Sequence, residues 1–425
     1  TYIRAGMSAY STGQWEPAKL YLERALELGA SDRDLMFSLA RAAEATQDKA
    51  RVVAILQKLA PEGRPVYAPA HFWMATQILN SGTVDRAEIR KAETHLKHIL
   101  QLNPGHTAAH GLLGDIYFQL GHWEAAARHL EQSNSGSPKY RLLLAKACLN
   151  AGDKTRAERY ARDGLKLAKE KCDSDPYDAD SRLLWAEATA LLEQFEQAVS
   201  ILAAGLRQQD TWLLRVAMTR VYIHWADSVE GLSEDDQRRR FGLLAEAMKY
   251  NPNETALFDR LMKILNEGGG ASEDTKQFLL KSIAEKRAVG ISHLILGTAA
   301  WTGGDKAEAG VHLERAFAEL PDALAVANNF SWFLVNKAQS EPERALELIS
   351  PMAERFPENH FVRDTRGHIL LKLGRWKDAV DDLEFAVRGL PDNRQTHLSL
   401  ASAYRNLGLT DLADAYQQAA ERIPE

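Results

Sequence analysis

Six of the 13 histidines of this chain lie between residues 95 and 129, and imidazole is a common ligand of transition metals. They are His95, His98, His106, His110, His122 and His129. The three-residue spacing of His95 and His98 puts both rings on one face of a helix, as in some metal sites. His110 falls at a packing position of a different expected helix, and His106 and His122 fall at expected turns. We therefore expect no convergence of three ligands, and predict solvated histidines on helix surfaces and no metal site.

Other catalytic or cofactor-binding patterns are not found in the sequence. The Gly-rich stretches "EGGGASEDTK" and "TGGDK" do not have the residue order of a phosphate-binding loop. Neither the HExxH nor the GxSxG pattern occurs. The basic triplet at 238–240 follows Glu234, Asp235 and Asp236, which is typical of a solvated helix start and not of a nucleic-acid interface. We predict no catalytic residues and no cofactor, and hence no enzyme.

The composition is that of a folded, soluble protein. Of the 425 residues 45% are hydrophobic and 26% are charged, and the net charge of −6 offers no positive field for nucleic acid or anionic lipid. No apolar run approaches the roughly 20 residues that span a bilayer. We expect no membrane contact by this fragment itself. Because the chain begins with Thr1, we expect upstream residues to be missing, so an upstream anchor stays open, as does a cytoplasmic or periplasmic location. Of the two cysteines, Cys148 lies in the apolar stretch "LLLAKACLNAG", which predicts a buried free thiol.

The elements that must position any site are indicated by a repeated pattern. "LGHWEAAARHLEQSNSGSP" starts at Leu120 and "LGRWKDAVDDLEFAVRGLP" starts at Leu373. In both, the glycine is followed by a small residue at the fifth position, a large apolar one at the ninth and a small one at the twelfth. The small residues recur after six glycines: Gly13, Gly121, Gly152, Gly304, Gly374 and Gly408. Steps of four and three residues return to one helix face, so each unit is predicted to be a helical hairpin whose glycine ends the first helix.

The first helices carry a second pattern. "HGLLGDIYFQLG" contains Leu113, Gly114 and Tyr117, and "HLSLASAYRNLG" contains the corresponding Leu400, Ala401 and Tyr404. This resembles the tetratricopeptide repeat, which has W-x2-L-G-x2-Y, then A-x3-F, then P, in a period of 34 residues. The segment "NNFSWFLVNKAQSEPERALELISPMAERFPEN" resembles a bacterial variant with a longer loop between the two helices.

The resemblance implies an all-α fold, an α-solenoid with a right-handed superhelix. The spacing predicts about twelve helical hairpins. Their second helices are expected to be centred near Leu22, Leu56, Leu96, Leu130, Ala161, Leu202, Leu244, Leu279, Leu313, Ile349, Leu383 and Gln417.

The irregular segments predict the domain organisation. Ser233 with Asp236 is a helix start that makes the seventh hairpin long, and Ser272 is expected to cap the eighth hairpin's second helix. The stretch "NSGTVDRAEIR" is expected to lengthen the third hairpin. The last helix is expected to have one apolar stripe, formed by Leu412, Ala413, Tyr416, Ala420 and Ile423, and an opposite polar side. We expect repeat units, truncated at the start, over 1–60, a Pro-rich joint over 61–70, repeat units over 71–169, a linker extension over 170–180, units with a long hairpin insertion at 226–241 over 181–290, and regular units with a polar capping helix over 291–425.

The expected function follows from the solenoid, whose concave face is lined by first helices. In the C-terminal units this face is predicted to include Leu294, Thr298, Trp301, Asn328, Asn329, Trp332, Asp364, His368, Lys372, Ser402, Arg405 and Asn406. Aromatic, amide and charged side chains together suit the recognition of a protein or peptide. Nine of these residues are predicted to bind the partner: Trp301, Asn328, Asn329, Trp332, Asp364, His368, Lys372, Arg405 and Asn406. The alternative for Trp301 and Trp332 is that they only pack between hairpins. The resemblance implies a non-enzymatic scaffold or adaptor for protein–protein interaction. The other hypothesis is the partner-presenting repeat arm of a larger membrane-associated enzyme, or of a polysaccharide or protein export machine.

Overall fold

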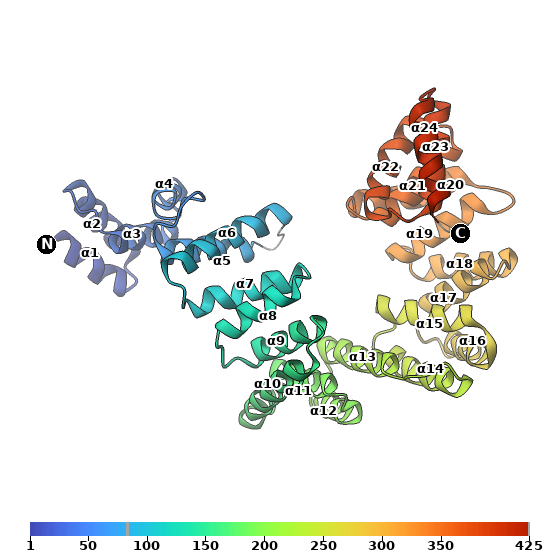
Figure 1. Ribbon diagram of the computed structural model, residues 1–425, viewed down its shortest axis with the longest axis horizontal. Coiled ribbons are helices and arrows are strands. Elements are labelled where there is room, and N and C mark those ends of the chain that lie inside the picture. Colours follow the sequence, from blue (N-terminus) through green and yellow to red (C-terminus); the bar gives the residue numbers. More distant parts are fainter. Residues whose placement is uncertain (82–84, 424–425) are drawn as a thin grey trace. The chain divides into compact units, whose positions relative to one another are not determined.

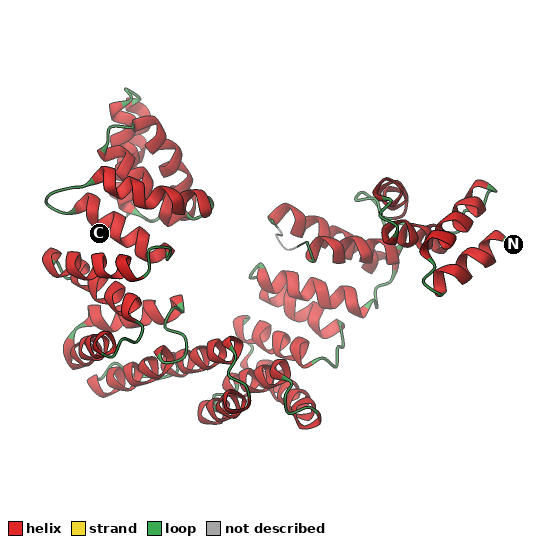
Figure 2. Ribbon diagram, turned by 180° about the vertical axis from the view of Figure 1, so that it is seen from behind, coloured by secondary structure: helices red, strands yellow, loops and turns green. Residues whose placement is uncertain are grey.

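The chain folds into helices. A computed structural model describes residues 1–81 and 85–423, and in these residues it contains helices α1 to α24 and no strand (Figure 1, Figure 2). Two compact units are formed, Thr1–Asp210 and Thr211–Glu425. The prediction of an all-α fold is confirmed.

In the first unit the helices are α1 (Tyr2–Ser11), α2 (Trp15–Glu27), α3 (Arg33–Ala45), α4 (Lys49–Leu59), α5 (Ala68–Leu79), α6 (Arg86–Leu102), α7 (Thr107–Gln119), α8 (Trp123–Gln132), α9 (Pro138–Asn150), α10 (Lys154–Ser174), α11 (Ala179–Leu191) and α12 (Phe195–Gln208). In the second unit they are α13 (Trp212–Asp227), α14 (Glu234–Met248), α15 (Thr255–Glu267), α16 (Gly269–Ala284), α17 (Val289–Thr302), α18 (Lys306–Glu319), α19 (Leu324–Asn336), α20 (Pro342–Arg355), α21 (His360–Lys372), α22 (Trp376–Gly389), α23 (Arg394–Asn406) and α24 (Thr410–Arg422).

Consecutive helices pair into hairpins, from α1 with α2 to α23 with α24. Each even-numbered helix contains the residue at which a second helix was expected to be centred, from Leu22 in α2 to Gln417 in α24. Within the described residues each unit is therefore an α-solenoid of hairpins, and the expected hairpin number and register are confirmed.

The six glycines of the pattern end first helices in the left-handed conformation, as predicted. Their φ angles range from 72° at Gly13 and Gly374 to 87° at Gly304. A side chain at such a φ is strained, so glycine is favoured at this turn.

The small residues allow the two helices of a hairpin to approach closely. Ala18, Ala309 and Ala379, each five residues after its glycine, are completely buried. A Cβ atom added to Gly114 in α7 would lie 2.5 Å from Cγ of Leu130 in α8, closer than carbon atoms pack. Similar short distances occur in three more hairpins, at Gly6, Gly297 and Gly367.

In the second unit the apolar seams of successive hairpins pack together. One core cluster of the second unit extends from Leu294 in α17, through Phe330 in α19, to Ile369 in α21. This is the packing expected of a repeat array, in which each unit contacts its neighbours.

Two irregular segments differ from the sequence-based expectation. The N-cap assigned to Ser272 is wrong, because α16 begins at Gly269, directly after Gly268 with a φ of 75°, and Ser272 lies buried inside the helix. Its Oγ donates a hydrogen bond to the carbonyl of Leu265. In addition, residues 170–174 continue α10, so the expected linker extension begins as helix. The insertion expected in the third hairpin lies partly outside the described residues, at 82–84.

The seventh hairpin, α13 with α14, has the predicted capped start. Ser233 and Asp236 form a capping box at the N-terminus of α14. Leu232 at the tip has 84% of its surface exposed. Arg238 pairs with Glu234 and Asp274, and Arg240 donates to the carbonyls of Val229 and Gly231, so these two arginines of the basic triplet are used within the fold.

The last helix, α24, shows the expected polar side to solvent. Asp411, Asp414, Gln418 and Glu421 are exposed, whereas Ala413 and Ala420 are buried. Leu412 was assigned to the buried stripe, but it is exposed. The stripe is therefore narrower than the sequence suggested.

Candidate functional site

A hollow of about 290 Å³ lies on the first helices of the second unit. The first helices α17, α19, α21 and α23 contact one another in succession. The residues that line the hollow are Thr298, Trp301, Leu313, Asn328, Asn329, Trp332, Phe361, Asp364, Thr365, Asn393 and Gln395. We refer to this surface as the first-helix groove.

The aromatic side chains of the groove are partly exposed. The Trp301 ring meets the Phe333 ring edge-on, with centroids 5.7 Å apart, and Trp332 lies 4.8 Å from the ring of His368. Both tryptophans thus pack within the fold and also line the groove. Phe361 has 63% of its surface exposed. A large apolar side chain from a binding partner would therefore find aromatic surface that is already partly dehydrated.

Two adjacent amides form the polar part of the groove. Asn328 donates from Nδ2 to Oδ1 of Asn329 at 3.4 Å, and Asn329 donates from its own Nδ2 to Oγ1 of Thr298 at 3.1 Å. Oδ1 of Asn328 is buried and has no hydrogen-bond partner. A buried acceptor of this kind is costly unless it is paired, so an N–H group of a ligand would gain from binding there.

Asp364 adds a buried carboxyl group. Its side chain is 8% exposed, and Oδ1 accepts a hydrogen bond of 2.7 Å from Oγ1 of Thr396. Burial raises the pKa of Asp364 above its ordinary value, and the hydrogen bond from Thr396 opposes that shift only in part. The carboxylate form of Asp364 is therefore only partly stabilised within the fold, and a cationic or N–H donor group of a ligand could stabilise it further.

The structure brings five of the nine predicted binding residues into the groove: Trp301, Asn328, Asn329, Trp332 and Asp364. Of the other predicted lining residues Thr298 is there too, whereas Leu294 was wrongly placed, because it is buried in the core.

The remaining four predicted binding residues do not line the hollow. His368 lies behind Trp332, where its Nδ1 and Nε2 atoms are both 3.2 Å from their partners, Oγ of Ser399 and Oδ1 of Asn336. Lys372 is exposed beyond the groove. Nη2 of Arg405 is 3.8 Å from Asp414, and Asn406 donates to the carbonyl of Ser402.

Sequence reasoning missed five lining residues: Leu313, Phe361, Thr365, Asn393 and Gln395. Phe361 could have been found, because it lies three residues before Asp364 and hence on the same face of α21. Asn393 precedes α23 as its N-cap, a position that a helix-face pattern does not include.

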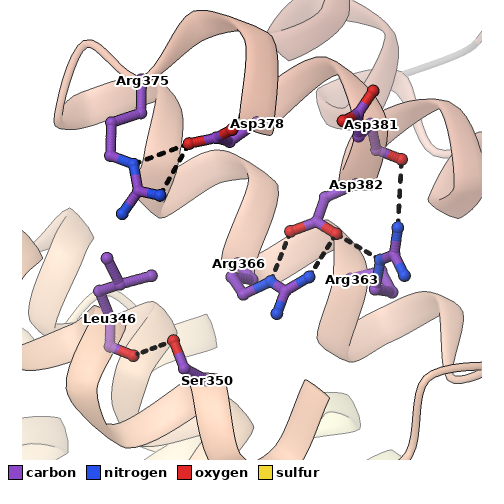
Figure 3. Close-up of polar contacts among 8 residues, drawn as sticks. All are labelled: Leu346, Ser350, Arg363, Arg366, Arg375, Asp378, Asp381 and Asp382. Carbon is purple, nitrogen blue, oxygen red and sulfur yellow. Dashed lines mark hydrogen bonds and ion pairs between the residues drawn. The ribbon is translucent and has the colours of Figure 1, made fainter. Parts of the chain in front are cut away.

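A second hollow of the second unit, between α20, α21 and α22, is lined with charged groups (Figure 3). Arg366 donates from Nε and Nη2 to the two carboxylate oxygens of Asp382, at 2.6 and 2.7 Å. Arg363 also pairs with Asp382, and it donates to the carbonyl of Asp381. Asp382 is only 1% exposed. Because its carboxylate is already bound by two guanidinium groups, we interpret this cluster as an ion-pair network that joins α21 to α22.

The prediction of solvated histidines is wrong for three of the six residues in the segment 95–129. His95, His98 and His110 are buried. Nδ1 of His110 in α7 is 2.9 Å from Nδ1 of His129 in α8. His95 and His129 occupy equivalent places in successive hairpins, and each contacts a first-helix histidine of its own hairpin. The partner of His95 is His71, whose Nδ1 is 2.8 Å from Nδ1 of His95.

His71 lies outside the segment in which the sequence concentrates histidines, and it was therefore overlooked. It stands 24 residues before His95, whereas the pairs His110–His129 and His293–His312 are 19 residues apart. Because the third hairpin has a longer connection between its helices, the sequence spacing does not show that His71 and His95 correspond to the other two pairs. The expectation that three histidines do not converge is therefore wrong, because His71 joins His95 and His98 in one cluster.

Within the described residues no helix combines the length and the apolar character needed to cross a membrane.

Comparison with known proteins identifies the repeat. Two family models described as tetratricopeptide repeat match the chain, one over residues 84–140 and the other over residues 3–65 and 365–425. No curated protein matches the sequence.

Solved structures similar to this chain include the APC/C hetero-tetramer Cut9–Hcn1, with 13% identity, a TM-score of 0.38 and coverage of 99% of this chain and 93% of that one. Yeast Tom70 has 15% identity and a TM-score of 0.36, with coverage of 100% of this chain and 91% of that chain. MamA from AMB-1 has 24% identity and a TM-score of 0.31, with coverage of 39% of this chain and 96% of that chain.

Proposed function

Because the chain carries tetratricopeptide repeats, we propose that it is a non-enzymatic scaffold that binds an extended segment of a partner protein in the first-helix groove. The groove lies within the second unit and is built from successive first helices, which place their side chains along one surface. Such a surface suits a chain segment in extended conformation, whose backbone groups are free to pair with side-chain amides.

The observation that carries this proposal is the combination of exposed aromatic surface with an unpaired buried acceptor. Phe361 is largely exposed beside Trp332, and Oδ1 of Asn328 has no partner. A large apolar side chain of a partner segment would cover the exposed ring of Phe361, and a backbone N–H group of that segment would donate to Oδ1 of Asn328. Asp364 favours a basic residue in the same segment. We therefore expect a ligand that combines an apolar anchor with a positive charge.

The rival surface is the tip of the seventh hairpin. Its basic triplet offers fewer free donors than the sequence suggests, since Arg238 and Arg240 already bind Glu234, Asp274 and backbone carbonyls. An exposed ion pair is also weak and easily screened by salt. The groove is accordingly the better candidate. If the chain is the repeat arm of a larger enzyme or export machine, the same groove would hold the presented segment.

The proposal is tested by selecting peptides from a displayed random library on the purified full chain and measuring their dissociation constants by fluorescence anisotropy. Asn328→Ala and Trp332→Ala are expected to weaken binding by about tenfold or more, the range typical of central interface residues. The matched control replaces Arg238, Arg239 and Arg240 by Ala at the hairpin tip, and it is expected to leave the affinity within about twofold of the original value.

Circular dichroism must first show that the helical content of each variant is unchanged. If the hairpin variant loses peptide binding while both groove variants retain it, the binding site lies on the seventh hairpin and the proposal is wrong. A failure to select any peptide that competes for the groove would also contradict the proposal.

A further inference from the structure

The histidine cluster of the third hairpin has the arrangement of a metal site. We propose that His71 of α5, together with His95 and His98 of α6, binds one divalent transition-metal ion of the zinc class. One nitrogen from each of the three rings lies within 4.8 Å of one nitrogen from each of the others. The three side chains are 0%, 1% and 8% exposed, in that order. Neutral imidazole nitrogen is a preferred ligand of zinc, copper and nickel ions.

The hydrogen bonding of the cluster is incomplete without a further partner. The Nδ1 atoms of His71 and His95 are 2.8 Å apart, and the rings of His71 and His98 are 4.9 Å apart. Nε2 of His95 and Nδ1 of His98 are buried and have no hydrogen-bond partner. Buried polar atoms are rarely left unpaired, because each one costs about 1–3 kcal/mol of desolvation. Two such atoms in one three-imidazole cluster therefore indicate a ligand.

The two-histidine pairs of other hairpins provide the comparison. In the pair His110–His129, Nε2 of His110 is 2.9 Å from the carbonyl of Pro104 and so is satisfied. After burial and the neighbouring His110, the charges of Arg128 and Lys97 also lower the pKa of His129. Those cations would repel a metal ion. The third-hairpin cluster has instead a carboxylate, Glu62, whose charge acts on His95.

The cluster is compact enough to become a tetrahedral site after a small movement of its rings. With metal–nitrogen bonds of about 2.0–2.1 Å, ligand nitrogens in a tetrahedral site are about 3.3 Å apart. The three ligand nitrogens, which now lie within 4.8 Å of one another, would thus move closer together when the ion binds. The fourth position remains for water or for Glu62. The ion would hold α5 to α6 beside the loop at 60–67.

The test measures zinc on the full chain after any histidine tag has been removed. The protein is stripped with a chelator, dialysed against zinc and then against zinc-free buffer, and analysed by mass spectrometry for metal content. We expect one zinc ion per chain in the unmodified protein and none in His98→Ala. A cobalt(II) titration should give the visible absorption of tetrahedral coordination in the first protein and not in the second.

The matched control is His129→Ala, which removes the histidine at the equivalent position of the next hairpin and should retain one zinc ion. No zinc on the unmodified chain, equal zinc on His98→Ala, or equal loss in His129→Ala would each overturn the proposal. If His98→Ala fails to fold, the cobalt spectrum of the unmodified chain decides: tetrahedral absorption supports the site, and its absence overturns it.

Discussion

Arg363 and Asp382, nineteen residues apart, face each other across the eleventh hairpin, α21 with α22, at the same two positions that His110 and His129 occupy in the fourth hairpin, α7 with α8. The same spacing joins Tyr2 to Tyr21 in the first hairpin and His397 to Tyr416 in the last. Each of these hairpins thus places a polar or aromatic pair beside its apolar seam. The identity of the pair varies, which allows one backbone geometry to hold an ion pair, a ring contact or two imidazoles.

Replacing Asp382 by Ala is expected to destabilise the eleventh hairpin by about 3 kcal/mol, because Arg363 and Arg366 would keep partly buried charges without a partner. Since a repeat array loses structure locally, hydrogen exchange of the amides in α21 and α22 is the appropriate measurement. Asp378→Ala, which breaks the exposed ion pair with Arg375, should change this protection by less than about 1 kcal/mol. Equal effects of the two changes would show that the network is not structural.

Replacing Ala379 by Leu is expected to cost about 1–3 kcal/mol, since Ala379 is completely buried and an extra isobutyl group must push α22 away from its neighbours. Ala415→Leu introduces the same side chain at an exposed position of α24 and should have little effect. Chemical denaturation followed by circular dichroism compares the two variants. A neutral Ala379→Leu would mean that the register of the second helices is wrong.

Two Gly→Ala substitutions are predicted to change the stability of their hairpins in opposite directions. Gly114→Ala should destabilise the fourth hairpin by about 1–3 kcal/mol, because the new methyl group would overlap Leu130. Gly242→Ala, inside α14 with open space around its Cα atom, should stabilise its hairpin by about 0.5–1 kcal/mol through the better helix propensity of alanine. Hydrogen exchange of α7–α8 and of α13–α14 separates the two results. Stabilisation by Gly114→Ala would exclude the close approach of α7 and α8.

Acid is predicted to weaken the helices behind the groove through His368. Burial and then the charge of Lys372 lower the pKa of His368 to about 4 in the folded chain, whereas an exposed histidine has a pKa near 6.5. Between these two pH values the unfolded state binds the additional proton, so local stability falls as the pH falls from about 6.5 towards about 4. His368→Gln should flatten this dependence in the protection factors of α21 and α23. If the variant keeps the same pH dependence of protection, a group other than His368 causes the loss of stability in acid.

The fold could be predicted because its sequence determinants are local steric requirements. Gly121 and Gly374 end helices at a left-handed turn, and Ala126 and Ala379 stand where two helices approach closely. The N-cap prediction at Ser272 was wrong because α16 begins at Gly269, directly after its N-cap Gly268 and about one turn before the expected start. A helix boundary in a Gly-rich segment depends on tertiary contacts, here the buried bond from Ser272 to Leu265, which no local pattern contains.

The candidate site was less accessible to sequence reasoning. The helix period placed Trp301, Asn329 and Trp332 on one face, and the structure puts them in one hollow. It did not show that His368 turns behind Trp332 to bond Asn336 and Ser399, because a buried hydrogen-bond partner can compete with the groove for a polar side chain. His71 was missed for a related reason, since the pair that it forms with His95 depends on the length of the intervening loop.

The most direct test of partner binding in the first-helix groove compares two exposed aromatic residues of the second unit. Phe361 in the groove is 63% exposed and Trp212 at the start of α13 is 62% exposed, so truncation of either should preserve the fold. The measurement is the dissociation constant of one selected peptide for the full chain, for Phe361→Ala and for Trp212→Ala. Binding in the groove predicts a loss of about tenfold or more for Phe361→Ala and an unchanged value for Trp212→Ala. An unchanged value for Phe361→Ala, with or without a loss for Trp212→Ala, would contradict the account.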